Sequence, residues 1–212
     1  DGLGLGYLEL CVIAEELGRS LAPTPFSSSV YLATEFLLKL GSDEIKQNYL
    51  PKLASGSSIG TFAHTEGNTA PTEANITSEV KDNVMNGTKI VVPDGYVADF
   101  AVVTTKEGSN IGLYIVDLKS DGVEVVSQQT LDPSRSHASL IFKDVKTITL
   151  GSLNEGWDNL QNVLDRAAVL FVFEQLGGAE ASMNMAKEYA MGRFAFGRSI
   201  ASFQAIKHKL AD

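Results

Sequence analysis

"GRFAFGRSIASFQAIKHKLAD" covers residues 192–212 and contains the most informative pattern in the sequence. Arg193, Phe196 and Gly197 form an R-x-x-F-G unit, which predicts a turn. An apolar series follows at helical spacing: Ile200, Phe203, Ile206 and Leu210. The unit therefore predicts a turn between two helices. Because the chain ends while this helical pattern continues, we expect the sequence to be a fragment of a longer protein.

A long helical pattern precedes the turn. From residue 151 the apolar residues recur at helical spacing, and the pattern runs through Gly177-Gly178 to Tyr189 without a strong breaker. The repeat consists of Trp157, Leu160, Leu164, Ala167 or Ala168, Phe171, Leu176 and Met185. At about 1.5 Å per residue, this helix is about 45 Å long or slightly more. A long helix followed by an interrupted one predicts the first part of a helical bundle over residues 151–212.

The first 57 residues also have helical patterns. A first helix contains Leu8, Cys11 and Leu17, and we expect Gly18 to be its left-handed cap. A second helical series runs through residues 32–40 and ends at Gly41. The final helix of this region begins after Ser42, whose hydroxyl can accept from the open N–H groups, and ends between Pro51 and Gly56. Residues 1–57 are therefore predicted to belong to a helical domain.

The middle of the chain, residues 58–150, shows strand-like patterns instead. Seven short apolar segments are separated by turn residues. The segments cover residues 59–64, 76–80, 84–92, 98–104, 112–117, 123–127 and 138–142. Asp82-Asn83 and Asn86-Gly87 are predicted as tight turns, because Asn and Gly tolerate positive φ. This punctuation predicts an antiparallel sandwich or barrel, and not alternating βαβ units.

Composition excludes several kinds of partner. The formal net charge is -9 with a pI near 4.8, and no basic cluster is present, which argues against nucleic-acid binding. The single cysteine, Cys11, lies in an apolar helical run and is expected to be buried, so nothing indicates an oxidising compartment. No apolar run reaches the roughly 18 to 20 residues needed to span a bilayer. We therefore expect a cytoplasmic protein with no membrane or nucleic-acid partner.

Motifs for metal or nucleophile chemistry are not evident. His64, His137 and His208 are scattered and share no ligand spacing, so no metal site is predicted. No G-x-S-x-G motif occurs, and no catalytic residue is proposed. The "GLGLG" stretch at residues 2–6 lacks the spacing and preceding strand of a dinucleotide motif, and is interpreted as an entry to a helix.

Two segments remain candidates for ligand binding. The stretch "TFAHTEGNTAPTEANIT", residues 61–77, follows a strand; it is either a connecting loop or the polar edge of a site for a flavin or similar planar cofactor. Arg193 either interacts favourably with the dipole at the C-terminal end of the long helix or binds a phosphate. In the second case Phe196 would stack nearby and Gln204 would offer an amide.

Four sequence segments resemble the acyl-CoA dehydrogenase family of flavoproteins. They are "YLPKLASG" (residues 49–56), "NGTK" (86–89), "LGSLNEGWDNLQNVLD" (150–165) and the R-x-x-F-G tail (193–212). The resemblance implies an α+β fold with an N-terminal helical domain (1–57), a central antiparallel β domain (58–150) and the first helices of a C-terminal bundle (151–212). It also implies FAD held between the subunits of a homodimer or a heterotetramer. The reaction would be α,β-dehydrogenation of an acyl-CoA thioester, with electrons passed to electron-transfer flavoprotein or another acceptor.

The resemblance also suggests individual site residues. It implies cofactor contacts by Phe62, Thr65, Arg193, Phe196 and Gln204. Other positions depart from the family pattern. The positions that differ are Gly67 for Pro in T-E-P, Ala70, Pro71 and Thr72 for G-S-D, Val91, Val92 and Pro93 for W-I-T, and Ala168 for the substrate-helix Arg. The catalytic glutamate of most members would lie beyond residue 212, and Ala167 occupies the position that some members use instead.

These departures leave alternatives open. The fragment is expected to be inactive by itself, while the full-length enzyme or its heteromeric complex oxidises an acyl-CoA. Half-degenerate subunits of this kind occur in heteromeric members that act on sterol side-chain CoA thioesters. A non-catalytic interaction subunit and a flavin enzyme that acts on nitroalkanes or another non-CoA substrate are the remaining interpretations.

Overall fold

The computed structural model describes residues 4–132 and 134–211. Its internal contacts divide the chain into two units. We call Pro23–Ala167 the sheet unit, and Asp1–Ala22 together with Ala168–Asp212 the helix-pair unit. The division into 1–57, 58–150 and 151–212 inferred from the sequence stays a prediction.

Helical segments open the sheet unit. They are η1 (Ser27–Thr34, a π-helix), α2 (Glu35–Leu40) and α3 (Asp43–Ser55). Ser42 caps α3 as predicted, because its hydroxyl accepts a hydrogen bond from the N–H of Ile45 at 3.3 Å. Gly56 ends α3 in the left-handed conformation with φ 71°, which confirms the predicted end of this helix.

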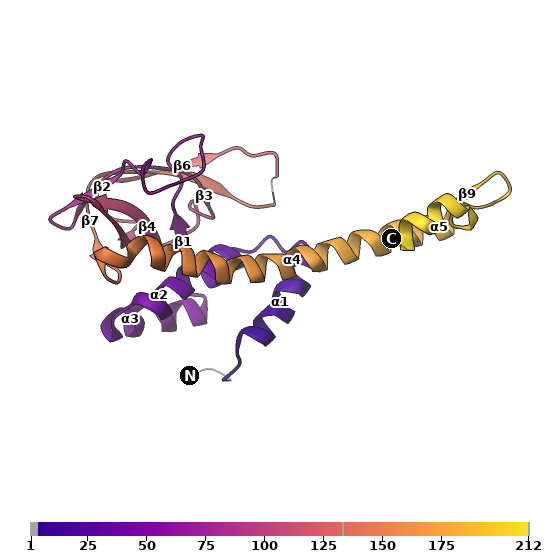
Figure 1. Ribbon diagram of the computed structural model, residues 1–212, viewed down its shortest axis with the longest axis horizontal. Helices are drawn as coiled ribbons and strands as arrows, with labels where there is room; N and C mark the ends of the chain where they lie inside the picture. Colours follow the sequence, from indigo (N-terminus) through magenta and orange to yellow (C-terminus); the bar gives the residue numbers. More distant parts are fainter. Residues whose placement is uncertain (1–3, 133, 212) are drawn as a thin grey trace. The chain divides into compact units, whose positions relative to one another are not determined.

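The strands of the sheet unit form one eight-stranded sheet (Figure 1). They are β1 (Gly60–Ala63), β2 (Glu79–Lys81), β3 (Val84–Pro93), β4 (Phe100–Glu107), β5 (Asn110–Asp117), β6 (Val123–Gln128), β7 (His137–Lys146) and β8 (Ile148–Thr149). Along the sheet the order is β6-β7-β3-β2-β4-β5-β8, and β1 also pairs with β4. Most neighbours are antiparallel as predicted, but β1 and β2 run parallel to β4. The sheet is therefore mixed.

One of the two predicted tight turns is confirmed and the other is wrong. Asp82 and Asn83 have φ of 52° and 60° and connect β2 to β3. Asn86-Gly87 instead lies inside β3, where the pairing with β7 shifts register between Met85 and Gly87. Gly87 has φ 147°, so the dipeptide serves a bulge. The same residue chemistry suits a turn and a bulge, and the pairing with β7 decides between them.

Strand β4 is buried on both of its faces, and buried apolar residues from β1 to β5 and β7 form a core cluster of the sheet unit. Its members are Ala63, Val80, Met85, Val92, Ala98, Ala101, Val103, Tyr114, Val116, Leu118, Ala138, Leu140, Phe142 and Val145. The start of α4 (Gly156–Gly192) follows η2 (Leu153–Glu155) and buries Leu160, Val163 and Ala167. The predicted contact residue Leu164 is only half-buried, one position from the buried Val163.

The helix-pair unit consists of α1 and the later part of α4, followed by short elements. These are α1 (Tyr7–Arg19), β9 (Phe194–Ala195), β10 (Arg198–Ser199), η3 (Ile200–Ser202) and α5 (Gln204–Ala211). The whole of α4 has 37 residues, which at 1.5 Å per residue is about 55 Å. This is longer than the sequence pattern predicted. Cys11 is buried on α1 as predicted.

The prediction that Gly18 caps α1 is wrong. Gly18 lies inside the helix, and the chain leaves the helix at Ser20 in the αR conformation. A Cβ atom at Gly18 would lie 1.7 Å from the carbonyl oxygen of Glu174 on α4. Glycine is therefore required here by the close approach of two backbones, and not by a left-handed φ. Within residues 4–132 and 134–211, no helix combines the length and apolarity required to cross a bilayer.

Candidate functional site

The R-x-x-F-G unit forms a hairpin between α4 and α5. Phe196 and Gly197 have φ of 53° and 78°, as expected for a two-residue hairpin turn with both central residues at positive φ. Arg198 pairs with Ala195, and Ser199 pairs with Phe194. The predicted turn between two helices is thus confirmed, and we call residues 193–200 the aromatic hairpin.

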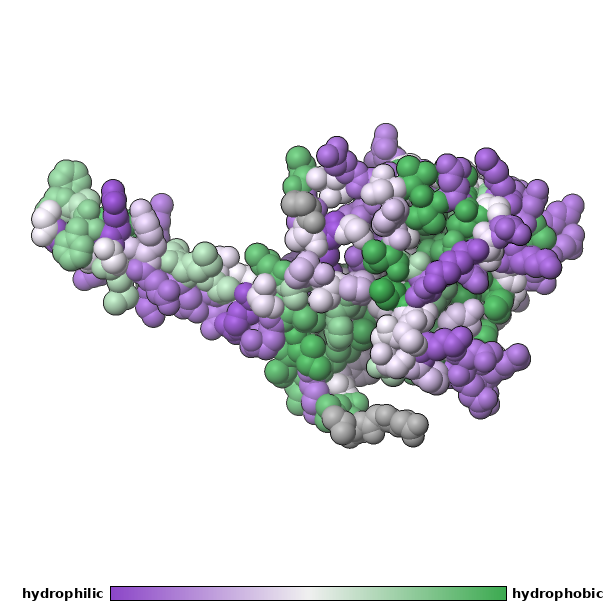
Figure 2. Space-filling model, turned by 180° about the vertical axis from the view of Figure 1, so that it is seen from behind, coloured by the Kyte–Doolittle hydropathy of each residue, from purple (hydrophilic) through white to green (hydrophobic). Residues whose placement is uncertain are grey.

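The aromatic hairpin presents its predicted ligand-binding side chains to the outside. Arg193 and Gln204 are exposed, and Phe196 is 95% exposed. Figure 2 shows pale green hydrophobic side chains at this end of the chain, where Phe194 is also exposed. Exposed aromatic rings cost hydration free energy unless a ligand or partner covers them. The hairpin therefore has the properties of a binding surface.

Side-chain contacts connect the hairpin to the start of α5. The rings of Phe196 and Phe203 meet edge to face with centroids 6.3 Å apart. The Arg198 guanidinium lies 4.0 Å from the centroid of the Phe203 ring. Because Gln204 directly follows Phe203, these contacts bring Phe196 and Gln204 into one region of the helix-pair unit. Sequence reasoning did not identify Arg198 and Phe203 as site residues; the basic residue after the F-G pair was the available signal.

The predicted cofactor residue Phe62 packs inside the sheet unit. Only 7% of Phe62 is exposed. Its ring centroid lies 4.8 Å from that of Phe36 on α2 and 5.5 Å from the stacked ring of His64. The ring of Phe62 is thus committed to the core, and a cofactor contact at this position would have to come from the main chain. The role of Phe62 stays a prediction.

Thr65 stands at the end of β1, beside a network centred on Glu66. The Thr65 carbonyl accepts a hydrogen bond from the N–H of Ile90 on β3 at 2.8 Å. Glu66 accepts from the ammonium of Lys89 at 2.5 Å, from the Thr77 N–H at 2.5 Å and from the Thr77 hydroxyl at 2.6 Å. The side chain of Lys89 is fully buried. Through Glu66 and Thr77, the network attaches both ends of the loop at 67–76 to Lys89 of the sheet.

Charge and burial compete within this network. Burial by itself raises the pKa of Glu66, but the Lys89 charge and the hydrogen bonds from Lys89, Thr77 and Ser78 lower it to about 2. Burial lowers the pKa of Lys89 to about 8, although Glu66 opposes this change. Burial and the Lys89 charge lower the pKa of His64 to about 4. At neutral pH, Glu66 and Lys89 are therefore an ion pair and the His64 imidazole is neutral.

The segment from Val91 to Pro93 does not fit the ring of a flavin. Val91 is half-exposed at φ 52°, but its N–H already donates to the Gln128 side chain at 3.0 Å. Val92 is buried, and Pro93 has no N–H donor. The Pro93 carbonyl accepts from the Thr61 hydroxyl. This segment therefore offers no aromatic ring to a planar cofactor, and neither Val91 nor Pro93 has a free main-chain donor.

The aromatic hairpin does fit the nucleotide end of such a cofactor. Phosphate needs cationic donors and adenine needs a ring or flat surface, and the hairpin exposes both kinds of side chain. The predicted site residues thus fall into two groups in different units. Phe62 and Thr65 belong to the sheet unit, and Arg193, Phe196 and Gln204 belong to the helix-pair unit.

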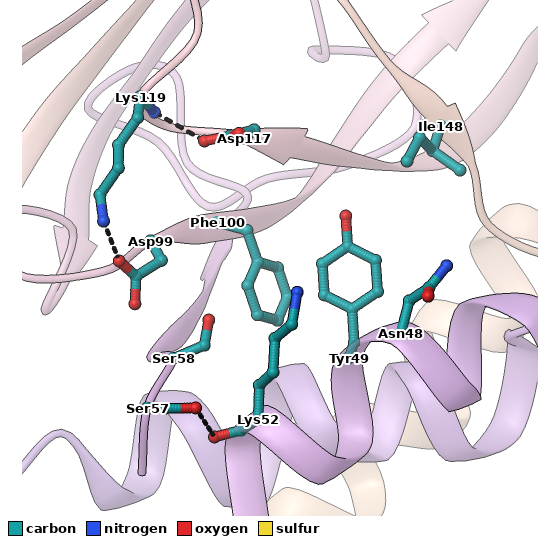
Figure 3. A pocket seen from close by; sticks show the side chains of 10 residues that line it. All are labelled: Asn48, Tyr49, Lys52, Ser57, Ser58, Asp99, Phe100, Asp117, Lys119 and Ile148. Carbon is teal, nitrogen blue, oxygen red and sulfur yellow. Dashed lines mark hydrogen bonds and ion pairs between the residues drawn. The ribbon is translucent and has the colours of Figure 1, made fainter.

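A separate cavity of about 610 Å³ lies between α3 and the ends of β4 and β5. Figure 3 shows the rings of Tyr49 and Phe100 next to Lys52. The Lys119 ammonium donates to the Asp99 carboxylate at 2.5 Å, and the backbone N–H of Lys119 donates to the Asp117 carboxylate at 2.8 Å. The lining thus mixes both signs of charge, and none of the predicted cofactor residues belongs to it. Within the part of the chain that the structure describes, no group of three or more His, Cys, Asp or Glu residues could hold a metal ion.

Sequence reasoning missed the importance of Lys89. It noted Glu66 and Lys89 only as parts of separate motifs, and the structure pairs them across 23 positions of the chain. The available signal was a lysine within a run of β-branched residues, because a strand buries a charge there only when a partner is present.

Comparison with known proteins agrees with this architecture. Family models match residues 1–57, as the acyl-CoA dehydrogenase N-terminal domain, and residues 154–212, as the acyl-CoA dehydrogenase C-terminal domain. The short-chain specific acyl-CoA dehydrogenase of Rattus norvegicus mitochondria is 31% identical over the whole chain, which covers 55% of that protein. The chain therefore spans about half the length of the curated relatives that it matches.

Solved structures show the same fold. The acyl-CoA dehydrogenase from Geobacillus kaustophilus has a TM-score of 0.89 and 26% identity, with 99% of this chain and 60% of that chain covered. The ChsE4-ChsE5 complex from Mycobacterium tuberculosis has a TM-score of 0.85 and 29% identity, with 100% of this chain and 57% of that chain covered. Together with the helices, mixed sheet and long C-terminal helix described above, these matches show that the chain belongs to the acyl-CoA dehydrogenase family.

Proposed function

We propose that the chain is part of an FAD-linked acyl-CoA dehydrogenase subunit. The observation that supports this most directly is the exposure of Arg193 and Phe196 on the aromatic hairpin and of Gln204 at the start of α5. Their chemistry suits the pyrophosphate and adenine of FAD. A flavin held there would supply the hydride acceptor for oxidation at the β-carbon of an acyl-CoA thioester.

The residues of this chain contribute binding and positioning. The hairpin holds the nucleotide end of a flavin across a subunit boundary, in a homodimer or a heterotetramer. The Val91–Pro93 segment lacks an aromatic ring to stack on a flavin, and the Val91 N–H is already bonded, so the flavin ring is held mainly by a partner subunit of different sequence, which favours the heterotetramer. The ChsE4-ChsE5 complex, a relative with two different subunits, supports this assignment.

Chemistry requires a base for the α-proton of the substrate. Ala167 stands at the long-helix position that some members of the family use for this base, and it is 1% exposed. An alanine cannot accept a proton, so we propose that these 212 residues do not turn over an acyl-CoA by themselves. The proposed substrate is the CoA thioester of an acyl chain or of a sterol side chain. The proposed electron acceptor is electron-transfer flavoprotein or another acceptor, and the proposed location is the cytoplasm.

An absorbance spectrum tests the assignment. The protein as its gene encodes it is purified alone and after co-expression with the product of the neighbouring gene, and the flavin band is measured in both. We expect flavin in the co-purified complex, and a strong decrease of bound flavin when Phe196→Ala is introduced. Lys209→Met, which removes an exposed charge from α5, is the matched control and should keep the flavin. A colourless protein under both conditions would refute the proposal.

A second candidate is a non-catalytic interaction subunit that keeps the fold as a scaffold. The departures at Val91–Pro93 and Ala167 favour it. In this case the co-purified complex would be stable and would contain no flavin, and the Phe196→Ala variant would weaken the association itself. Analytical ultracentrifugation of the wild-type and Phe196→Ala complexes separates the two candidates.

A further inference from the structure

The aromatic hairpin contains a second arginine that the proposed function has not used. Arg198 is exposed and is directly opposite Ala195 in the strand pairing. Residues that pair directly lie on the same face of a hairpin, and successive residues alternate between faces. Arg193 is two positions before Ala195, and its carbonyl accepts the N–H of Ile200 at 2.8 Å. Arg193 and Arg198 therefore occupy the same face as diagonal neighbours.

Diagonal neighbours are close enough for one ligand to contact both. Diagonal neighbours in an antiparallel pair are about 7 to 8 Å apart, with their Cβ atoms somewhat closer, within the reach of long side chains. A pyrophosphate has two adjacent anionic phosphate groups. Two guanidinium groups on one hairpin face match such a group in charge, and each can donate two parallel hydrogen bonds to a phosphate.

The ion pairs of the helix-pair unit support a ligand role. The chain has nine more acidic than basic residues, and Arg19 of this unit pairs with Glu15, Glu16 and Glu180. Within the described residues, neither Arg193 nor Arg198 pairs with a carboxylate. In a chain with excess acid, two unpaired arginines on one face are available for an external anion.

The position of Arg198 is also fixed in advance. Its guanidinium lies 4.0 Å from the centroid of the Phe203 ring, and the edge of the Phe196 ring faces the same ring. A cation held over an aromatic face loses less side-chain freedom when it binds a ligand. A guanidinium carries five N–H donors, so a contact with one ring leaves donors available to an anion.

We propose that Arg198 is a second pyrophosphate-binding residue, which acts with Arg193 on the FAD held by the aromatic hairpin. This inference rests on the proposed function, because the ligand is the same. It adds Arg198 to the residues that bind FAD. It also predicts that the hairpin binds a nucleoside diphosphate more tightly than a monophosphate, because two arginines contact two phosphate groups.

The test measures binding and does not depend on turnover. Dissociation constants of FAD are determined by flavin fluorescence for the protein as encoded, together with its partner subunit if FAD requires one. ADP and AMP are then measured by competition. Arg198→Met retains an apolar side chain over Phe203 and removes the charge, Arg198→Lys retains the charge, and Lys209→Met is the control for loss of an exposed charge on α5.

We expect Arg198→Met to weaken FAD and ADP roughly tenfold, with a smaller effect on AMP. Arg198→Lys should recover part of the affinity, and Lys209→Met should bind as wild type. If Arg193→Met weakens FAD while Arg198→Met does not, the inference is wrong and the proposed function stands. Equal loss in Arg198→Met and Arg198→Lys would show that packing over Phe203 matters and not charge, which also overturns the inference. If wild type binds no FAD with or without a partner, both proposals fail.

Discussion

The crossing of α1 and α4 in the helix-pair unit predicts opposite effects for two adjacent glycines. A Cβ atom at Gly177 would lie 1.8 Å from the carbonyl oxygen of Glu15 and 2.9 Å from the backbone nitrogen of Arg19. A Cβ atom at Gly178 would have its nearest contact at 3.5 Å, which is an ordinary van der Waals distance. Gly177→Ala and Gly178→Ala therefore add the same methyl group to the same helix in different surroundings.

The magnitudes follow from two competing effects. Alanine is about 1 kcal/mol more favourable than glycine inside a helix, so Gly178→Ala should stabilise the protein by up to about 1 kcal/mol. At Gly177 the methyl group meets main-chain atoms that cannot rotate away, and the helices would have to separate by more than about 1.5 Å. Overpacking of this kind costs about 1 to 3 kcal/mol or more, so Gly177→Ala should destabilise despite its better helix propensity.

Thermal unfolding followed by circular dichroism, together with urea titration, measures both variants. A change of 1 kcal/mol corresponds to about 2 to 4 °C in the midpoint for a chain of this size. We expect Gly178→Ala to unfold at or above the wild-type temperature, and Gly177→Ala to unfold several degrees below it. Gly18→Ala, with a Cβ position 1.7 Å from the Glu174 carbonyl, should behave like Gly177→Ala. If Gly177→Ala and Gly178→Ala were equally stable, the close crossing of α1 and α4 would be wrong.

Other predictions concern the buried ion pair, the helix cap and the hairpin. Lys89→Met leaves Glu66 buried without its cation and should cost about 3 to 5 kcal/mol in urea unfolding, while Lys89→Met with Glu66→Gln should recover part of this loss. Because the pKa of Glu66 is lowered to about 2, the contribution of its carboxylate to the free energy of unfolding is complete above about pH 4.5 and is lost as the pH falls toward 2. Glu66→Gln should therefore flatten the dependence of stability on pH in this window. An unchanged pH dependence would contradict the ion pair. Ser42→Ala removes the acceptor for the Ile45 N–H and should cost about 1 kcal/mol, measured by urea titration against Ser42→Asp, which keeps a cap. Phe196→Ala should leave the melting temperature unchanged, because the ring is 95% exposed; a large loss of stability would show that the ring packs within the protein.

Several features of the site could be predicted from sequence because their causes are local. The turn at Phe196-Gly197 has positive φ at both central positions; Gly197 adopts it freely and is the local signal in R-x-x-F-G, whereas Phe196 adopts it at a steric cost. The 95% exposure of Phe196 agrees with its place at the tip of a two-residue turn, where its ring meets only the edge-to-face contact with Phe203 among the described ring contacts. The cofactor role of Phe62, in contrast, came from a resemblance, and the packing of its ring between Phe36 and His64 depends on α2, which is distant in the sequence.

The sequence by itself determined the order of the elements, the cap at Ser42 and the turn at Asp82-Asn83, because each depends on the φ preference or hydrogen-bonding groups of a few consecutive residues. Tertiary structure alone decided the rest. The pairing with β7 made Asn86-Gly87 a bulge, and the approach of α4 gave Gly18 its role in helix packing. In both cases the residue preference permits several conformations, and the free energy of contacts with distant segments selects one of them.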